Sequence, residues 1–176
     1  MLTRVNAALA ALLVLALVLL IGVLIGGNRV LPWTTGAERQ VNAYADVQAA
    51  ATKSVLAFLD VDYQHMDQKQ KLVQSLATGT FKKQYAATEV ELKAAAQSAH
   101  AVSTGTVRYV GIRSLAGQTA KALVAADVVV SNTATAKQKA TTACPHDGAR
   151  CDQYRFVVTM TDTADGWKMS DLAGVA

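Results

Sequence analysis

The sequence predicts an α+β protein with one transmembrane helix, followed by three helices and a four-stranded antiparallel sheet. Residues 7–25 are nineteen consecutive residues without a charged or polar side chain. Apolar residues then recur at helical spacing as far as His100, and beyond it at the two-residue spacing of strands. A run of helices followed by a run of strands is typical of an α+β domain whose helices pack on one sheet face.

The N-terminal apolar run is long enough to span a membrane. A helix of this length covers about 28 Å at about 1.5 Å per residue, close to a hydrocarbon core of about 30 Å. We therefore predict a transmembrane helix over 7–27, with Trp33 as a candidate interfacial anchor. The alternative is a cleaved secretory signal, but large residues precede the small pair Gly26-Gly27, which makes a poor cleavage site.

The two cysteines predict the orientation of the span, because the flanking charges balance. Arg4 and the amino terminus lie on one side, and Arg29 and Arg39 on the other. Cys144 and Cys151 are the only cysteines in the chain, and disulfides persist in oxidising compartments. We expect them to form a disulfide in a domain outside the cytoplasm. The predicted organisation is a cytoplasmic tail (1–6), a transmembrane helix (7–27), a juxtamembrane linker (28–36) and an extracytoplasmic domain (37–176), all in the cell membrane as a single-pass protein.

Two alternatives for the cysteines stay open, namely free thiols and a metal site. Cys144, His146, Asp147 and Cys151 crowd into eight residues, and all four side chains can bind zinc. Structural zinc sites usually draw their ligands from two separated pairs, and the sequence has no second pair. We therefore predict no metal and no cofactor.

The charge of the soluble part argues against a nucleic-acid partner. From residue 37 onward there are fifteen Lys or Arg and thirteen Asp or Glu, and the basic residues are scattered without aromatic interleaving. Nucleic-acid binding normally requires a clustered basic patch. The remaining length of about 140 residues suits one domain with its own core.

The first helix of this domain is predicted to begin at a capping box and to end near Asp60. Thr35 supplies the hydroxyl of the box, and Glu38 the carboxylate three residues later. Apolar residues then follow at steps of three and four, which predicts one buried stripe. The stripe consists of Val41, Tyr44, Val47, Ala51, Val55 and Phe58.

Two further helices are predicted between Asp67 and His100. Asp67 with Gln70 repeats the capping pattern and opens a short helix that Gly79 ends. Thr80 can cap the next helix, which is rich in residues with high helix propensity. Its expected buried face is Phe81, Tyr85, Leu92, Ala95 and Ala99.

Four strands are predicted after His100. The first runs over 102–115, and the second, over 122–130, is apolar at both parities and is expected to be buried on both faces. A polar loop over 133–143 leads to a strand over 154–161 with one mainly apolar face. Asp165-Gly166 is expected to form a two-residue hairpin turn with two positive φ values, leading to a last strand over 167–172.

Several stretches, spread over most of residues 40–175, resemble the Mce-associated membrane proteins of actinobacteria. They are Phe58-Leu-Asp-Val-Asp-Tyr63, Leu76-Ala-Thr-Gly-Thr-Phe-Lys-Lys-Gln-Tyr85, Ser103-Thr-Gly-Thr-Val107, Ala122-Leu-Val-Ala-Ala-Asp-Val-Val-Val-Ser-Asn-Thr133, Tyr154-Arg-Phe156 and Asp165-Gly-Trp-Lys-Met-Ser-Asp-Leu172. The resemblance implies an extracytoplasmic domain similar to nuclear transport factor 2 (NTF2) or cystatin. The loop between the two cysteines departs from the plainer connection of that family.

The resemblance also implies a function. Proteins of this family accompany the mammalian-cell-entry (Mce) complexes, which import lipids and sterols, and are thought to stabilise them. The chain is therefore expected to be a non-enzymatic accessory protein that binds Mce proteins or other envelope proteins, with a lipid as a further candidate ligand. Two alternatives are an inner-membrane assembly protein of a type IV secretion system and a ketosteroid-isomerase-like enzyme or lipid-binding domain.

The enzyme alternative depends on carboxylates near a tyrosine in an apolar cone. Candidates are Asp60, Asp62, Tyr63 and His65 after the first helix, and Asp127 within an apolar strand. Asp127 lies at the parity opposite to Val124, Ala126 and Val128, so it can face solvent or pair with a base on the next strand. We predict no catalytic residue. Candidate pocket-lining aromatic residues are Tyr44, Phe58, Tyr63, Tyr85, Tyr154, Phe156 and Trp167, although such a set is more often plain core.

Overall fold

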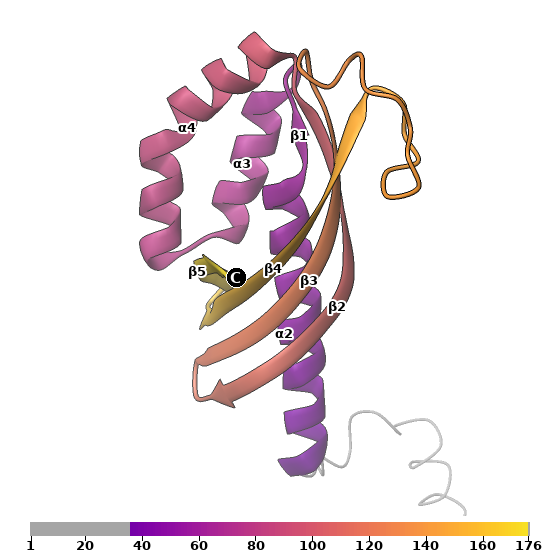
Figure 1. Ribbon diagram of the computed structural model, residues 1–176. Helices are drawn as coiled ribbons and strands as arrows, with labels where there is room; N and C mark the ends of the chain where they lie inside the picture. The colour runs from indigo at the N-terminus through magenta and orange to yellow at the C-terminus, as the bar shows by residue number, and fades with distance from the viewer. Residues whose placement is uncertain (1–35, 176) are drawn as a thin grey trace, which may run out of the picture. The chain divides into compact units, whose positions relative to one another are not determined.

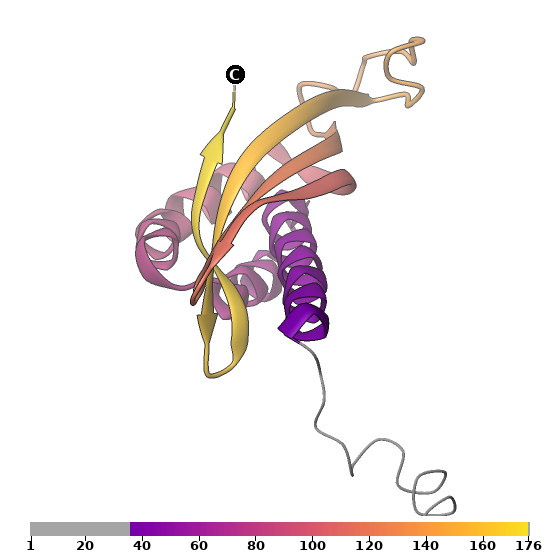
Figure 2. The same cartoon turned by 90° about the horizontal axis from the view of Figure 1, so that it is seen from below.

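Three helices cover one face of an antiparallel sheet in the structure, a computed structural model that describes residues 36–175, with side chains from Gln40 onward. Figures 1 and 2 show the helices on one side of the sheet and no helix on its other side. The helices are α2 (Gly36–Leu59), α3 (Met66–Leu76) and α4 (Gly79–Ala99). The strands are β1 (Val61–Asp62), β2 (Val102–Ala116), β3 (Thr119–Ser131), β4 (Ala149–Thr163) and β5 (Gly166–Gly174).

Residues 36–175 contain no helix with the length and apolar character needed to cross a bilayer. The predicted cytoplasmic tail, the span over 7–27 and Trp33 lie outside the described residues. The same is true of the capping box predicted for Thr35 and Glu38. Gly36, which the prediction assigned to the linker, is the first residue of α2.

α2 forms over the range that the capping pattern and apolar stripe predict, and its middle carries the core contacts. Val47, Ala51 and Val55 are completely buried, whereas Val41, at the start of the stripe, is 65% exposed. Leu59, in the last turn, packs closely against β2, where a Cβ on Gly105 would lie 2.9 Å from the Leu59 Cβ. The C-terminal half of α2 therefore holds the helix against the sheet.

The junction between α3 and α4 differs from the prediction. α3 ends at Leu76, and Gly79, which was expected to terminate it, is instead the first residue of α4, with φ at +56°. Thr78, not Thr80, precedes α4, and its N–H donates to the Met169 carbonyl of β5 at 2.8 Å. The chain reverses direction by pairing with the sheet edge, which local capping patterns do not encode.

The N-terminus of α3 and the face of α4 also need correction. His65 precedes α3, and Asp67 lies in the first turn, where its carboxylate accepts a 2.6 Å hydrogen bond from Lys93 of α4. The predicted apolar face of α4 is only partly covered, since Leu92 is 42% exposed and Ala95 is exposed. Ala96, together with Phe81, is buried in their place. α3 and α4 meet largely through polar side chains, which explains this exposure.

The sheet has five strands in the order β1-β2-β3-β4-β5, all antiparallel, one more than predicted. The additional strand, β1, is two residues long and pairs with the start of β2, and no periodicity can reveal so short an element. β3 pairs over its whole length with both β2 and β4, so it is the central strand.

β3 is buried on one face only, which corrects the prediction for this strand. Val124, Ala126 and Val128 are at most 3% exposed, whereas Leu123 is 46% exposed. The helices cover only the first of these two faces (Figure 2). The inner face of the sheet and the helices enclose one core. Its largest completely buried side chains are Met160, Met169, Val47, Val55, Val73, Val124, Val158 and Ser54.

The turn between β4 and β5 also differs in detail. Gly166 alone has a positive φ, at +89°, while Asp165 does not. Gly166 pairs with Thr163 at the start of β5, so the turn residues are Ala164 and Asp165. Asp165 instead accepts a 3.0 Å hydrogen bond from Lys168. The hairpin is at the predicted place, but only its glycine adopts the left-handed conformation.

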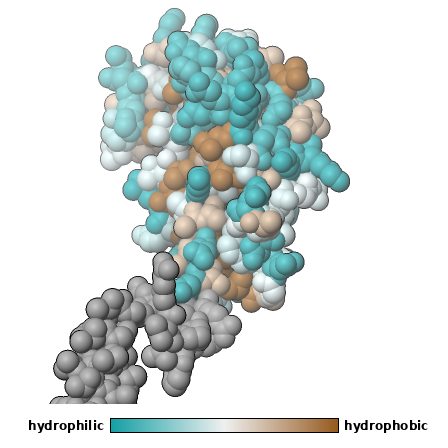
Figure 3. Space-filling view, turned by 180° about the vertical axis from the view of Figure 1, so that it is seen from behind, coloured by the Kyte–Doolittle hydropathy of each residue, from teal (hydrophilic) through white to brown (hydrophobic). Residues whose placement is uncertain are grey.

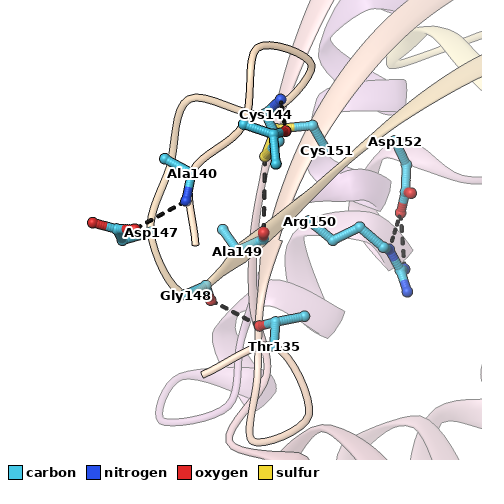
Figure 4. The surroundings of a disulfide bond; sticks show 10 residues. Thr135, Ala140, Cys144, Asp147, Gly148, Ala149, Arg150, Cys151 and Asp152 are labelled. Atoms are coloured by element: carbon cyan, nitrogen blue, oxygen red, sulfur yellow. Dashed lines mark hydrogen bonds and ion pairs between the residues drawn. A yellow bond between two sulfur atoms is a disulfide. The ribbon is translucent and has the colours of Figure 1, made fainter. Parts of the chain in front are cut away.

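The polar loop between β3 and β4 is closed by the predicted disulfide. Cys144 and Cys151 are bonded, with their Cα atoms 5.3 Å apart, so the free-thiol and zinc alternatives are wrong for these residues. Thr135 is 3% exposed and donates to the Gly148 carbonyl at 2.8 Å, and Asp147 accepts from the Ala140 N–H at 2.9 Å (Figure 4). The loop is therefore held by internal hydrogen bonds as well as by the disulfide.

Candidate functional site: the uncovered face of the sheet

The face of the sheet that carries no helix contains an apolar hollow of about 340 Å³. Its lining residues are Tyr109, Gly111, Leu123, Val124, Ala125, Arg155, Phe156 and Val175. Tyr109 is 79% exposed, and Leu123 and Val175 are each 46% exposed. This size is at the lower end of the range of small-ligand and side-chain pockets. The hollow is the candidate functional site of the described part of the chain.

Strand register explains why Tyr109, Gly111, Leu123, Ala125 and Arg155 share the outer face, whereas Val124 and Phe156 pair with each other at the buried parity. Opposite residues of an antiparallel pair lie on the same side of the sheet. Gly111 pairs with Leu123, and one row further on Tyr109 pairs with Ala125, which pairs with Arg155 of β4. The small side chains of Gly111 and Ala125 form the low part of the hollow, between the larger Tyr109 and Leu123.

Two arginines border the hollow and differ in their pairing. Arg108 lies at a bulge of β2 and donates to the Asp127 carboxylate of β3 at 2.7 Å. Arg155 belongs to the hollow itself and has no carboxylate within ion-pair distance among residues 40–175. Within the described part of the chain, the site therefore combines apolar surface with one guanidinium group that has no carboxylate partner.

The lining residues support binding through side chains more than through the backbone. β3 is paired on both sides, so its N–H and C=O groups are used in the ladder and offer nothing to a ligand. Tyr109 and Arg155 are the only titratable groups among the eight lining residues. The arrangement provides hydrophobic contact and one cation for an anionic group.

The structure distributes the candidate pocket aromatics over several places. Phe58 contacts Tyr85 edge-on at 6.5 Å, next to Phe81 in the core between α2 and α4. Burial, with the nearby Glu89 carboxylate adding to it, raises the pKa of Tyr85 above its ordinary value of 10.0. Phe156 is buried, lines the outer hollow and stacks on Tyr154 at 5.6 Å.

The other three candidate aromatics lie apart from these. Tyr44 is half-buried near the start of α2. Tyr63 meets the ring of His100 edge-on at 5.0 Å. Trp167 of β5 packs against the core as a partly buried residue.

The candidate carboxylates are all engaged near the surface. Asp127 pairs with Arg108, as its strand parity predicts. Asp62 accepts from the Gln64 N–H at 3.0 Å and is 2.7 Å from His65 Nδ1. These two contacts, that of His65 first, lower the pKa of Asp62 below 3.8.

Asp60, the third candidate carboxylate, accepts a hydrogen bond from Lys69 at 3.0 Å. Within the described part of the chain, no three His, Cys, Asp or Glu side chains gather as a metal site.

Sequence reasoning missed Tyr109, Leu123 and Arg155 as site residues. A signal for the face was present, because the parity of β3 that holds Leu123 and Ala125 also holds Lys121 and Asp127. Charged side chains at alternate positions mark a solvent-facing side, so an exposed Leu123 among them could have been recognised as unusual.

The arrangement of helices and sheet matches several solved structures of low sequence identity. An IcmL-like type IV secretion system protein from Legionella pneumophila has a TM-score of 0.57 at 15% identity, with 74% of this chain and 91% of that chain covered. CagV, a VirB8 homologue from Helicobacter pylori, has a TM-score of 0.56 at 9% identity over 74% and 97% of the chains. The periplasmic domain of DotI has a TM-score of 0.52 at 12% identity over 74% and 94%. The fold is thus the NTF2-like α+β fold.

Family membership follows from the sequence itself. Residues 4–175 match the family model described as "Uncharacterized protein Rv1363c/MT1408-like", and the chain belongs to this family. None of the curated proteins matches the sequence.

Proposed function

We propose that this protein is a non-enzymatic, single-pass accessory protein of the cell envelope, whose extracytoplasmic domain binds other envelope proteins during assembly of a membrane complex. The observation that carries the proposal is the fold. The domain aligns over more than 90% of the IcmL-like protein and of CagV, both of which are components of type IV secretion systems. An assembly role of this kind is therefore the first candidate.

The sequence of the N-terminal segment supports the envelope location. Residues 7–27 have the length and composition of a transmembrane helix. The disulfide between Cys144 and Cys151 is of the kind that persists in oxidising compartments, which supports a location of residues 37–176 outside the cytoplasm.

The surroundings of the carboxylates support a binding role over catalysis. A ketosteroid-isomerase-like mechanism needs a carboxylate in an apolar, enclosed site. Asp127 lies on the outer sheet face beside Arg108, and Asp62 is held by His65 and Gln64 near the surface. The inner face of the sheet, where such a site would lie, is filled by apolar side chains such as Met160 and Met169.

A second candidate is an accessory role in an Mce-type lipid importer, which the resemblance of several sequence stretches favours. Two of these stretches meet in space. Thr78, in the α3–α4 junction, donates to the Met169 carbonyl of β5 at 2.8 Å, and Ala77 beside it is 2% exposed. The resemblance therefore involves residues that build one connected part of the domain.

Isolation of the tagged full-length chain from native membranes tests both candidates. The chain is expressed in its own host at its natural level, solubilised in mild detergent and purified with its bound proteins, which are identified by mass spectrometry. A Leu123→Asp variant serves as the test of the outer hollow, and Leu72→Asp, at a similarly exposed position on α3, serves as its control.

Co-purifying secretion ATPases or channel subunits support the first candidate, and Mce subunits support the second. In either case Leu123→Asp lowers recovery of the partner while Leu72→Asp does not. Recovery of the protein without any envelope protein, from membranes or from the soluble fraction, contradicts the proposed function.

A further inference from the structure

A second surface of this chain has the properties that the outer hollow requires of a ligand. We define the α4 ridge as the exposed residues Ala86, Ala87, Val90, Glu91 and Ala94. Val90 is 81% exposed, the highest value among the large apolar side chains of the described residues. It lies nine residues after the buried Phe81, two and a half turns at about 3.6 residues per turn, and so points away from the core.

The composition of the ridge suits contact with a sheet. Its alanines are small enough to let the helix approach closely, with Val90 as the projecting side chain. Glu91 is exposed and has no ion-pair partner among residues 40–175. The ridge thus places one apolar side chain beside one free carboxylate, which matches the apolar hollow beside Arg155.

The hollow favours a helix over an extended segment. The backbone of β3 is fully paired, so an extended peptide lying over Leu123 and Ala125 would leave its own N–H and C=O groups without partners on an apolar floor. Such unpaired groups are costly when they are desolvated. A helix has its backbone groups satisfied internally and presents side chains alone.

Two other parts of this protein, the N-terminal segment and the outer sheet face of a second copy, are excluded as occupants of the hollow by their charge. Residues 1–35 contain Arg4 and Arg29 and no acidic residue, so they cannot balance Arg155. A contact between the outer sheet faces of two copies would bring Arg155 of one face towards Arg155 of the other, while Arg108 is already paired with Asp127 and offers neither a free charge nor a free carboxylate. Only a surface with an available carboxylate complements the hollow.

We propose that the outer hollow of one copy binds the α4 ridge of a second copy, with Val90 inserted beside Leu123 and Glu91 paired with Arg155. The hollow is on the outer face of the sheet, and α4 lies on the other side of the sheet (Figures 1 and 2). The contact is therefore head to tail, and each added copy presents a free hollow and a free ridge, so that rows of the protein form. This inference goes beyond the proposed function, which concerns other envelope proteins, and those proteins would bind the hollow that stays free at the end of a row.

Membrane attachment makes a weak contact of this kind effective. The ridge is narrow and rich in alanine, so the isolated contact is expected to be weak. Chains anchored in one membrane share a high local concentration, which raises occupancy without any additional contact. The test therefore uses the full chain in reconstituted vesicles.

Site-directed crosslinking tests the contact directly. Both native cysteines are bonded to each other, so a cysteine introduced by substitution is the only free thiol of the described residues. Full-length Val90→Cys carrying one tag and full-length Leu123→Cys carrying another are reconstituted together and treated with a mild oxidant or a short bismaleimide. The matched control replaces Leu123→Cys by Val102→Cys, which is 39% exposed at the start of β2.

The expected result is a mixed dimer from Val90→Cys with Leu123→Cys, and little product from either variant alone or from the Val102→Cys mixture. Arg155→Glu in the Leu123→Cys chain should lower the yield by roughly threefold to tenfold, and Glu91→Arg in its partner should restore it. A mixed yield no higher than that of the Val102→Cys mixture overturns the proposal. Equal crosslinking of Val90→Cys with itself also overturns it, because that result indicates a symmetric contact between two α4 helices.

Discussion

Replacing Gly105 by alanine should destabilise the domain because it separates α2 from the sheet. The new Cβ would lie 2.9 Å from the Leu59 Cβ and 3.3 Å from the Leu59 Cδ1, against a favourable carbon–carbon distance of about 3.5–4.0 Å. A Cβ is fixed to the backbone, so no rotamer change of Leu59 relieves the closest contact, and α2 or β2 has to move. Overpacking of this kind costs about 1–3 kcal/mol.

Gly111→Ala on the same strand is the matched control. A Cβ at Gly111 has no heavy atom within 4 Å. Replacing a strand glycine by alanine reduces the conformational entropy lost on folding and stabilises by about 0.5–1 kcal/mol. The same gain applies at Gly105, so the net loss for Gly105→Ala is about 0–2.5 kcal/mol, whereas Gly111→Ala should gain about 0.5–1 kcal/mol.

Urea unfolding of the full chain in mild detergent, followed by fluorescence of Trp167 in a Trp33→Phe background, measures both effects. With an m-value of about 2 kcal/mol/M, the two midpoints should differ by roughly 0.5–1.5 M. Leu59→Gly combined with Gly105→Ala should cost less than the sum of the single changes, because it removes the Leu59 Cβ and Cδ1 that the new Cβ would meet. Equal midpoints for the two glycine variants would refute the close packing of α2 on β2.

Three further predictions concern the disulfide, a buried hydroxyl and a tyrosine. Replacing Cys144 and Cys151 by alanine should lower the free energy of unfolding by about 2.5 kcal/mol, the chain-entropy value for an eight-residue loop, and an unchanged urea midpoint would contradict this. Ser54 is 1% exposed and its hydroxyl has no hydrogen-bond partner, so Ser54→Ala should leave stability unchanged or raise it by up to about 1 kcal/mol, while a clear loss would indicate an unseen partner. Burial, with Glu89 adding to it, raises the pKa of Tyr85 above 10.0, so the stability from its neutral phenol is complete below pH 10 and is lost as pH rises through the raised pKa. Absorbance titration should therefore give Tyr85→Phe a smaller high-pH step, and a Tyr85 midpoint at or below 10.0 would contradict the assignment.

The helices and strands could be predicted because their periodicity is local, whereas their ends depend on tertiary contacts. The stripe through Val47, Ala51 and Val55 predicted α2 correctly. Gly79, in contrast, has the residue type of a helix terminator but begins α4, because the preceding Thr78 pairs with the edge of β5. A capping pattern involves only residues within one helical turn. The boundary before α4 instead depends on Met169, some ninety positions away.

The candidate site was missed for a related reason. β3 is apolar at both parities, which is the usual pattern of a strand with two covered faces. Whether an element covers the second face is decided by tertiary packing, and in the described part of the chain all three helices lie on the inner face (Figure 2). Leu123 is therefore exposed although its neighbours resemble core residues.

The disulfide could be predicted from the sequence, whereas the arrangement of the aromatic residues could not. Cys144 and Cys151 lie close together in the sequence, and a bond between them needs only a short loop, so spacing was sufficient. The aromatic set needed a three-dimensional arrangement, and the structure spreads it from the core at Phe58 and Phe156 to the edge-on contact of Tyr63 with His100.

The edge of the sheet and its outer face differ in how well they can bind another molecule. Seen from behind, the surface is largely hydrophilic, with apolar atoms in separate patches (Figure 3). The strand edge of β2 is interrupted by register shifts around Arg108 and between Ile112 and Ser114, and irregular, charged edges disfavour pairing with another strand. Association by strand addition is therefore discouraged at this edge, whereas the face beside it offers the hollow. In the proposed assembly the protein meets its partners through side chains of the sheet face, and the irregular edge keeps the sheet from extending into neighbouring molecules.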